Sequence, residues 1–307
     1  MSSDLKLFRI TKDTVTELVG AAVALEKSLQ TLIERNMEAM FGARFIASEH
    51  STGVKHGGRI DSLGLDENGS PVIFEFKRAI NENVINQGLF YLDWLVDHRA
   101  EFQLLTLDRY GSEASKSIDW RTPRLVCIAS DFTKYDVHAV SQMGRSIELV
   151  RYSMFEGELI ALELIAAART PAGTSVDAPS PAGAQGTSSG KTVSEYLSQA
   201  PVDLADLYAE LEAYIEALGD DVTKKTLKLY FAFRRLKNFA CIEVHPQSQN
   251  LLIYLKVDPT TVTLEPGFSR DVRKIGHFGT GDLELRVSDR SHLEKAFPLI
   301  QRSYEES

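Results

Sequence analysis

Two acidic side chains and a lysine lie close together in residues 57–78, which read GGRIDSLGLDENGSPVIFEFKR. Asp61 belongs to the first half of this stretch, and Glu75 and Lys77 lie two residues apart in the second half. Because the side chains of a β-strand alternate between the two faces of a sheet, Glu75 and Lys77 project from the same face. Carboxylates that share a surface with an amine can bind a divalent cation and assist the attack of water on a phosphate ester.

Whether Asp61 and Glu75 can act together depends on the loop between the two predicted strands. With a two-residue loop (residues 68–69), residues whose numbers add up to 137 pair, and Asp61 lies on the opposite face from Glu75. With a three-residue loop (residues 67–69) that ends in a left-handed glycine, the total is 136 and Asp61 lies directly opposite Glu75. Opposed residues have Cβ atoms roughly 5 Å apart, and carboxylates so placed repel each other unless a cation lies between them. The three-residue loop therefore predicts a metal site in which Asp61 and Glu75 are ligands.

Helices are predicted on both sides of this hairpin. Apolar residues recur at helical spacing from Leu25 to Met40, and Gly42 follows where a helix commonly ends. After the hairpin, Asn81 or Asn83 can cap a second helix, on which one face carries Val84, Gln87, Tyr91 and Leu95. The following segments predict strands near 102–107 and 124–128, a helix at 135–143, and strands near 147–154 and 158–164. This order indicates an α/β domain.

Residues 170–192 differ from the rest because they are almost entirely Pro, Gly, Ala, Ser and Thr. Such a segment cannot bury enough apolar surface to order itself, which predicts a flexible linker between domains of residues 1–169 and 193–307. The second domain has patterns for a helix at 204–218, strands at 227–234, 239–245, 251–257 and 283–287, and a helix at 291–304. This pattern predicts a smaller α+β domain with a mostly antiparallel sheet. Its role is open, and recognition of nucleic acid or of a partner is the hypothesis. Its candidate basic patch is formed by Arg234, Arg235 and Lys237.

The pattern of Asp61, Glu75 and Lys77 resembles the PD-(D/E)XK nuclease superfamily, in which an Asp on one strand precedes Glu-x-Lys on the next. The run described above, followed by VINQGLFYLDWL, is most similar to the branch of NucS-type mismatch-cleaving endonucleases. The Pro-Asp of the superfamily name is Ile60-Asp61 here. The resemblance covers most of residues 20–165 and implies a restriction-endonuclease-like fold for the N-terminal domain. The C-terminal domain resembles an uncharacterised domain found in similar proteins.

This resemblance also implies the roles of individual residues. Asp61 and Glu75 would hold Mg²⁺, with Mn²⁺ as a possible substitute, the main-chain carbonyl of Phe76 would complete the metal site, and Lys77 would assist the attacking water. Members of the superfamily often add a Gln from the following helix, which is Gln87 here, and some add a Glu from the first helix. Glu26 and Glu34 both qualify for that last position. DNA is the implied substrate, and paired sites for cutting both strands imply a homodimer.

The composition limits these expectations in two ways. A formal net charge of −9 gives the chain no overall basic footprint, so any binding of nucleic acid must rely on local clusters of cations. The apolar runs are too short to span a bilayer, and the first residues, MSSDLKLFRI, lack the pattern of a signal peptide. We therefore expect a cytoplasmic protein that does not bind membranes.

Two functions follow from the sequence. The first is an Mg²⁺-dependent endonuclease that hydrolyses DNA phosphodiester bonds at Asp61, Glu75 and Lys77. The alternative is a non-catalytic nucleic-acid or protein interaction module built on a nuclease-like core. The presence of all three side chains favours the enzyme, whereas the acidic net charge favours the module.

Overall fold

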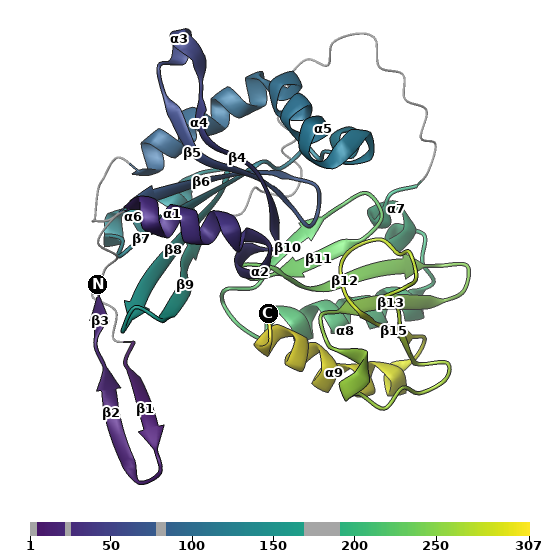
Figure 1. Cartoon of the computed structure of the whole chain (residues 1–307). Helices are drawn as coiled ribbons and strands as arrows, with labels where there is room; N and C mark the ends of the chain where they lie inside the picture. Colours follow the sequence, from purple (N-terminus) through teal and green to yellow (C-terminus); the bar gives the residue numbers. More distant parts are fainter. Residues whose placement is uncertain (1–4, 22–25, 78–83, 169–190) are drawn as a thin grey trace. The chain divides into compact units, whose positions relative to one another are not determined.

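The computed structural model describes residues 5–21, 26–77, 84–168 and 191–307 (Figure 1). The chain divides into two compact units, Met1–Val176 and Asp177–Ser307. Most of the predicted linker (residues 170–190) and the two predicted capping residues, Asn81 and Asn83, lie outside the described residues. No helix within the described ranges is both long and apolar enough to cross a membrane.

The first unit is a mixed α/β structure around a seven-stranded sheet. Its strands follow the spatial order β3, β8, β7, β6, β5, β4, and β9 pairs with β8. In chain order their bounds are β3 (Gly20–Ala21), β4 (Ala43–Ser51), β5 (Arg59–Asp66), β6 (Pro71–Lys77), β7 (Arg124–Ala129), β8 (Ser146–Phe155) and β9 (Leu159–Ala167). The central strands β6, β7 and β8 are parallel to one another, and the outer pairings are antiparallel. Parallel strands buried on both faces need helices on both sides, which the fold supplies.

The β5–β6 hairpin has the three-residue loop. Ser62 pairs with Phe74 and Leu65 with Pro71, which is the register whose residue numbers add up to 136. The loop ends at Gly69, whose φ of 76° lies in the left-handed region where glycine has no steric penalty. Asp66 pairs with Ser70 across the loop, because its main-chain N–H donates to the Ser70 carbonyl at 2.9 Å. The register therefore places Asp61 opposite Glu75.

Different helices cover the two faces of this hairpin. On one face, α1 (Glu26–Arg35) and α2 (Met37–Phe41) pack against β5 and β6, and the rings of Phe41 and Phe74 meet edge to face at 5.2 Å. The other face is covered by α4 (Val84–Asp97), whose residues Val84, Ile85 and Leu92 share a buried cluster with Ile73. Because side chains alternate along β6, Glu75 belongs to the α4 face and Phe74 to the α1 face.

The first unit differs from the sequence-based expectation in several places. The predicted strand near 102–107 is wrong, since these residues lie in the helix α5 (Arg99–Lys116). Phe102 and Thr106 are fully buried while Leu104 is 60% exposed, so burial follows the helical spacing of four and not the alternation of a strand. The predicted long first helix breaks at Asn36, whose side-chain amide donates to the Leu32 carbonyl at 2.8 Å.

A short hairpin of β1 (Leu7–Thr11) and β2 (Thr14–Leu18), which the sequence analysis did not predict, precedes the sheet. The other predicted elements of this unit are present, including the helix α6 (Lys134–Gln142). A short helix, α3 (Gly53–His56), joins β4 to β5.

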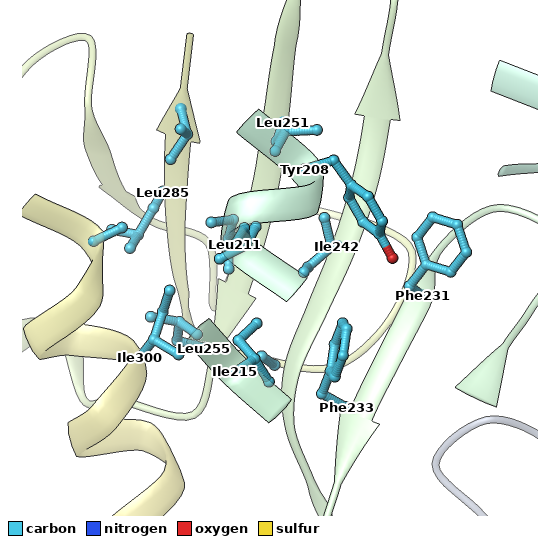
Figure 2. Packing of buried hydrophobic residues seen from close by; sticks show 14 of the residues in the cluster. Tyr208, Leu211, Ile215, Phe231, Phe233, Ile242, Leu251, Leu255, Leu285 and Ile300 are labelled. Carbon is cyan, nitrogen blue, oxygen red and sulfur yellow. The ribbon is translucent and has the colours of Figure 1, made fainter. Parts of the chain in front are cut away.

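The second unit is an α+β structure with an all-antiparallel sheet, as the sequence predicted. The sheet order is β10, β11, β12, β13, β15, β14. The bounds are α7 (Val193–Ser198), α8 (Val202–Glu216), β10 (Thr223–Thr226), β11 (Phe231–Arg234), β12 (Asn238–His245), β13 (Asn250–Leu255), η1 (Pro259–Thr261), β14 (Ser269–Asp271), β15 (Leu283–Val287) and α9 (Arg290–Glu305). Figure 2 shows α8 and α9 contributing Leu211, Ile215 and Ile300 to a core with Phe233 and Leu285 of the sheet.

Only the second half of the predicted strand at 227–234 is a strand, β11, because residues 227–230 form the connection between β10 and β11. The predicted basic patch also does not consist of free cations in the described part of the chain. Arg234 is 5% exposed and donates to the Leu236 carbonyl, and Arg235 forms an ion pair with Asp221 at 2.6 Å.

A buried ion-pair group in the first unit joins the end of β5 to the first residues of β7 and β8. Arg124 of β7 is 2% exposed and forms ion pairs with Asp66 at 3.0 Å and Glu148 at 2.8 Å. These residues come from β5, β7 and β8, so the group links strands across the centre of the sheet. A buried cation of this kind is stable only while its anions remain in place.

Replacing Arg124 with Met should lower the free energy of unfolding by about 3–5 kcal/mol, because two carboxylates would stay buried without their cation. Urea denaturation of the full chain measures this loss. The matched control is Arg121→Ala, which removes an exposed arginine paired with Asp119 at 2.9 Å and should cost at most about 1 kcal/mol. Equal losses for the two variants would contradict the proposed stabilising role of Arg124.

Candidate active site

Strands β5 and β6 part at the position of the two predicted acids. Ser62–Phe74 is the last residue pair of their ladder, after which β5 stays paired with β4 and β6 with β7. The two carboxylates take over the missing ladder hydrogen bonds: Glu75 Oε1 accepts from the main-chain N–H of Asp61 at 3.2 Å, and Asp61 Oδ2 accepts from that of Phe76 at 2.9 Å. Asp61 and Glu75 therefore converge where the strands separate.

Glu75 is buried without being fully satisfied. Its side chain has no exposed surface, and Oε2 has no hydrogen-bond partner among the described residues. Burial, and next the charge of Asp61, raise the pKa of Glu75 to about 8. Burial also raises the pKa of Asp61, although the hydrogen bond from Phe76 and the charge of Lys77 oppose this shift. At neutral pH the pair therefore needs a proton or a cation to offset its repulsion.

Lys77 supplies positive charge beside this pair. It lies two residues after Glu75 on the same strand and face, and it is partly exposed. Its charge lowers the pKa values of both Asp61 and Glu75, which places the ammonium group within electrostatic reach of both carboxylates. The ammonium group makes no hydrogen bond or ion pair with the described part of the chain, so it is available to a ligand.

The donor set fits a small, hard divalent cation. Mg²⁺ prefers oxygen ligands and usually binds through one or two carboxylates plus water and substrate phosphate. Asp61 and Glu75 offer two carboxylates, and the unpartnered Glu75 Oε2 gives an acceptor that such a cation would satisfy. Within the described ranges, no group of three or more His, Cys, Asp or Glu side chains is placed to hold a metal ion.

Gln87 and Tyr91 lie together on α4, and their hydrogen bonds lead to the backbone of β5. The Gln87 amide donates to the Tyr91 hydroxyl at 3.0 Å, and that hydroxyl accepts from the main-chain N–H of Arg59 at 3.2 Å. No hydrogen bond joins Gln87 to Asp61, Glu75 or Lys77. Gln87 therefore acts on the strand that carries Asp61, and its predicted direct role in the site stays a prediction.

The two glutamates of α1 lie in different environments. Glu34 accepts from the Ser62 hydroxyl at 2.6 Å, and Ser62 alternates with Asp61, so Glu34 belongs to the opposite face of the sheet. Glu26 is exposed at the first position of α1, and its charge raises the pKa of Asp61. The geometry therefore favours Glu26 over Glu34 as a neighbour of the site.

Two residues near the site were not singled out from the sequence. Gln30 of α1 is 4% exposed, and its amide donates to the main-chain carbonyl of Asp61 at 2.7 Å, which fixes the backbone of that residue. Glu49 of β4 lies opposite Asp61, because Ser48 pairs with Ser62 and His50 with Ile60. The acid in the run RFIASEHS could have indicated Glu49, but no strand is predicted for that segment from the sequence alone.

A separate hollow of about 490 Å³ lies beside α3 and the junction of α4 with α5. Its lining includes His56, whose ring contacts those of Phe90 and His98. The described contacts connect His56 to neither Asp61 nor Glu75, so this hollow is distinct from the site.

Comparisons with known proteins give the following similarities. Residues 193–307 match a family model described as a domain of unknown function (DUF5655). Over 306 residues the chain is 27% identical to an uncharacterized protein of Haemophilus influenzae, covering 97% of this chain and 99% of that protein.

Among solved structures, a repair endonuclease from Pyrococcus abyssi is similar at 20% identity and a TM-score of 0.29, over 43% of this chain and 50% of that chain. An EndoMS complex with double-stranded DNA gives 20% identity and a TM-score of 0.29 over 43% and 47% of the two chains. The match thus spans about half the length of each solved chain. Likenesses this weak add no support to a function, which must come from the geometry of the site.

Without a divalent cation, the stability of the protein should fall as the pH rises from about 4.5 through about 8. The pKa of Glu75 is higher in the folded chain than its ordinary value of 4.5, so the folded state binds the proton more tightly and loses this advantage as the carboxyl ionises. The loss for one proton is at most about 1.4 kcal/mol per pH unit. Denaturation curves across this range, in the presence of a chelator, measure it.

Glu75→Gln is the matched control for this prediction, because the amide keeps the shape and an oxygen acceptor but cannot ionise. The variant should lose most of the pH dependence, and added Mg²⁺ should stabilise the wild type above pH 7 more than the variant. A pH profile shared by both proteins would show that Glu75 is not the group responsible.

Proposed function

We propose that this protein is a metal-dependent endonuclease of the PD-(D/E)XK type that hydrolyses DNA phosphodiester bonds at Asp61, Glu75 and Lys77. The observation that carries the proposal is the convergence of the buried Glu75 with the partly buried Asp61, both with raised pKa values, beside a lysine that has no partner in the described chain. A purely structural polar group would be expected to be fully paired. A carboxyl group with a raised pKa beside another carboxyl group is typical of a catalytic or cation-binding site.

Asp61 and Glu75 would hold Mg²⁺, or Mn²⁺ as a substitute, together with the main-chain carbonyl of Phe76. When bound, the cation would supply Lewis acidity that polarises a phosphate oxygen and lowers the pKa of water. The main-chain N–H groups of Asp61 and Phe76 keep the two carboxylates in place by their hydrogen bonds. This preorganisation avoids a cost of reorientation during the reaction.

The Lys77 ammonium would orient the attacking water and stabilise the negative charge that grows on the phosphate in the transition state. Gln30 and Tyr91 support this arrangement from opposite sides of β5, by hydrogen bonds to the main-chain carbonyl of Asp61 and the N–H of Arg59. The tethered second unit would recognise substrate or a partner. The expected homodimer stays a prediction.

Asp61→Asn and Lys77→Met should each reduce cleavage of DNA in Mg²⁺ by about 10²-fold or more, because each removes a charge that acts on the transition state. The measurement is single-turnover cleavage of single-stranded, duplex, mismatched and branched DNA by the full chain. Arg121→Ala, at the other end of the sheet, is the control and should cleave like the wild type.

If wild type and variants bind DNA but leave all four substrates intact in both Mg²⁺ and Mn²⁺, the protein is a binding module and not a nuclease. If the wild type cleaves and Lys77→Met cleaves equally well, the role given to Lys77 is wrong.

The two glutamates of α1 should also differ in the same assay. Glu26→Gln is expected to change the rate several-fold, since its charge reaches Asp61, whereas Glu34→Gln should leave cleavage unchanged because Glu34 binds Ser62 on the other face. A larger effect from Glu34→Gln than from Glu26→Gln would reverse this assignment.

A further inference from the structure

Two exposed cations converge on one carboxylate at the edge of the candidate site. Glu49 of β4 forms ion pairs with Lys27 of α1 at 2.7 Å and with Arg59 of β5 at 2.6 Å. The side chains of Lys27 and Arg59 remain 58% and 67% exposed, while that of Glu49 is 28% exposed. The carboxylate is therefore largely covered, and the two cations face solvent.

This group lies directly beside the two acids of the site. Glu49 is opposite Asp61 in the β4–β5 ladder, and Arg59 precedes Asp61 by two residues on β5. The negative charge of Glu49 also contributes to the raised pKa values of Asp61 and Glu75. An anion that reached Asp61 and Glu75 would therefore pass close to Lys27 and Arg59.

Stability does not explain the arrangement. Glu49 has a φ of 52°, in the left-handed region that few residues other than glycine adopt, and such backbone strain costs of order 1–3 kcal/mol. Ion pairs with exposed partners contribute only about 0–1 kcal/mol each. The gain from the two pairs is therefore about as large as the strain, so a net gain in stability does not account for the group.

We propose that Lys27 and Arg59 bind backbone phosphates of nucleic acid next to the phosphodiester that is cleaved, and that Glu49 holds the two cations in position until the backbone displaces it. This inference rests on the proposed nuclease function. Because the chain has a formal net charge of −9, a polyanion must be bound by local cations. Exchange of one anion for another keeps the two cations neutralised both before and after binding.

The salt dependence of binding tests this proposal, because each lost phosphate contact lowers the slope of log affinity against log salt by about 0.9 for duplex DNA. The parent is the full chain carrying Asp61→Asn, with a labelled DNA duplex and a chelator so that cleavage does not interfere. Lys27→Ala and Arg59→Ala are made in this parent. Arg59→Lys tests rescue by retained charge, and Arg121→Ala is the control, an exposed arginine that is also paired with an acid.

Lys27→Ala and Arg59→Ala should each lower the slope by about 0.9, so that a fourfold rise in salt weakens their binding about 3.5-fold less than it weakens the parent's. Arg59→Lys and Arg121→Ala should keep the slope of the parent. Glu49→Gln should bind DNA more tightly than the parent, because no carboxylate then competes with the phosphates.

Slopes for Lys27→Ala and Arg59→Ala equal to that of Arg121→Ala would overturn the inference while leaving the nuclease proposal intact. Weaker binding by Glu49→Gln would overturn the competition assigned to Glu49. A parent that binds no DNA at any salt concentration would instead refute the proposed function and, with it, this inference.

Discussion

Electrostatic repulsion between Asp61 and Glu75 is the constraint on which the candidate site depends. Both acids are held by main-chain hydrogen bonds at the point where β5 and β6 separate, and Glu75 is shielded from water. Low exposure makes an uncompensated negative charge costly, and a second carboxylate close by increases the cost. The raised pKa of Glu75 results from this unfavourable environment, and either a proton or a bound cation would offset it.

The surrounding fold prevents the pair from relaxing. On the α1 side, Gln30 holds the carbonyl of Asp61, and on the α4 side, Tyr91 holds the N–H of Arg59. Strand β5 is therefore fixed from both faces just where it leaves β6. At the other end of the hairpin, the buried pairs of Arg124 join β5, β7 and β8, so the register that opposes Asp61 to Glu75 is fixed at both ends. The strained site is thus supported by well-paired groups around it.

Charge is arranged locally in the first unit. The chain as a whole is acidic, yet Lys77, Lys27 and Arg59 lie around the two acids of the site. Of these cations, Lys27 and Arg59 are held by Glu49, and Lys77 makes no ion pair with the described residues. Net charge is therefore a poor guide to this surface, because the positive groups are few but are gathered where an anionic substrate would react.

The sequence by itself determined the local pattern. Alternation along residues 71–77 placed Glu75 and Lys77 on one face, and helical spacing identified α4, α6, α8 and α9, because these signals depend on the period of a single element. It left two loops open for the hairpin, and it misassigned residues 102–107, since a short apolar run fits either a strand or a helix until its neighbours are known.

Only the tertiary structure decided which side chains meet. The three-residue loop opposed Asp61 to Glu75, α1 directed Glu34 to the far face, and the pairing of β4 with β5 brought Glu49 beside Asp61. The burial that raises the pKa of Glu75 also comes from elements distant in the sequence. Pairing across strands and loss of water are properties of the assembled sheet, so no periodicity within one segment could have predicted them.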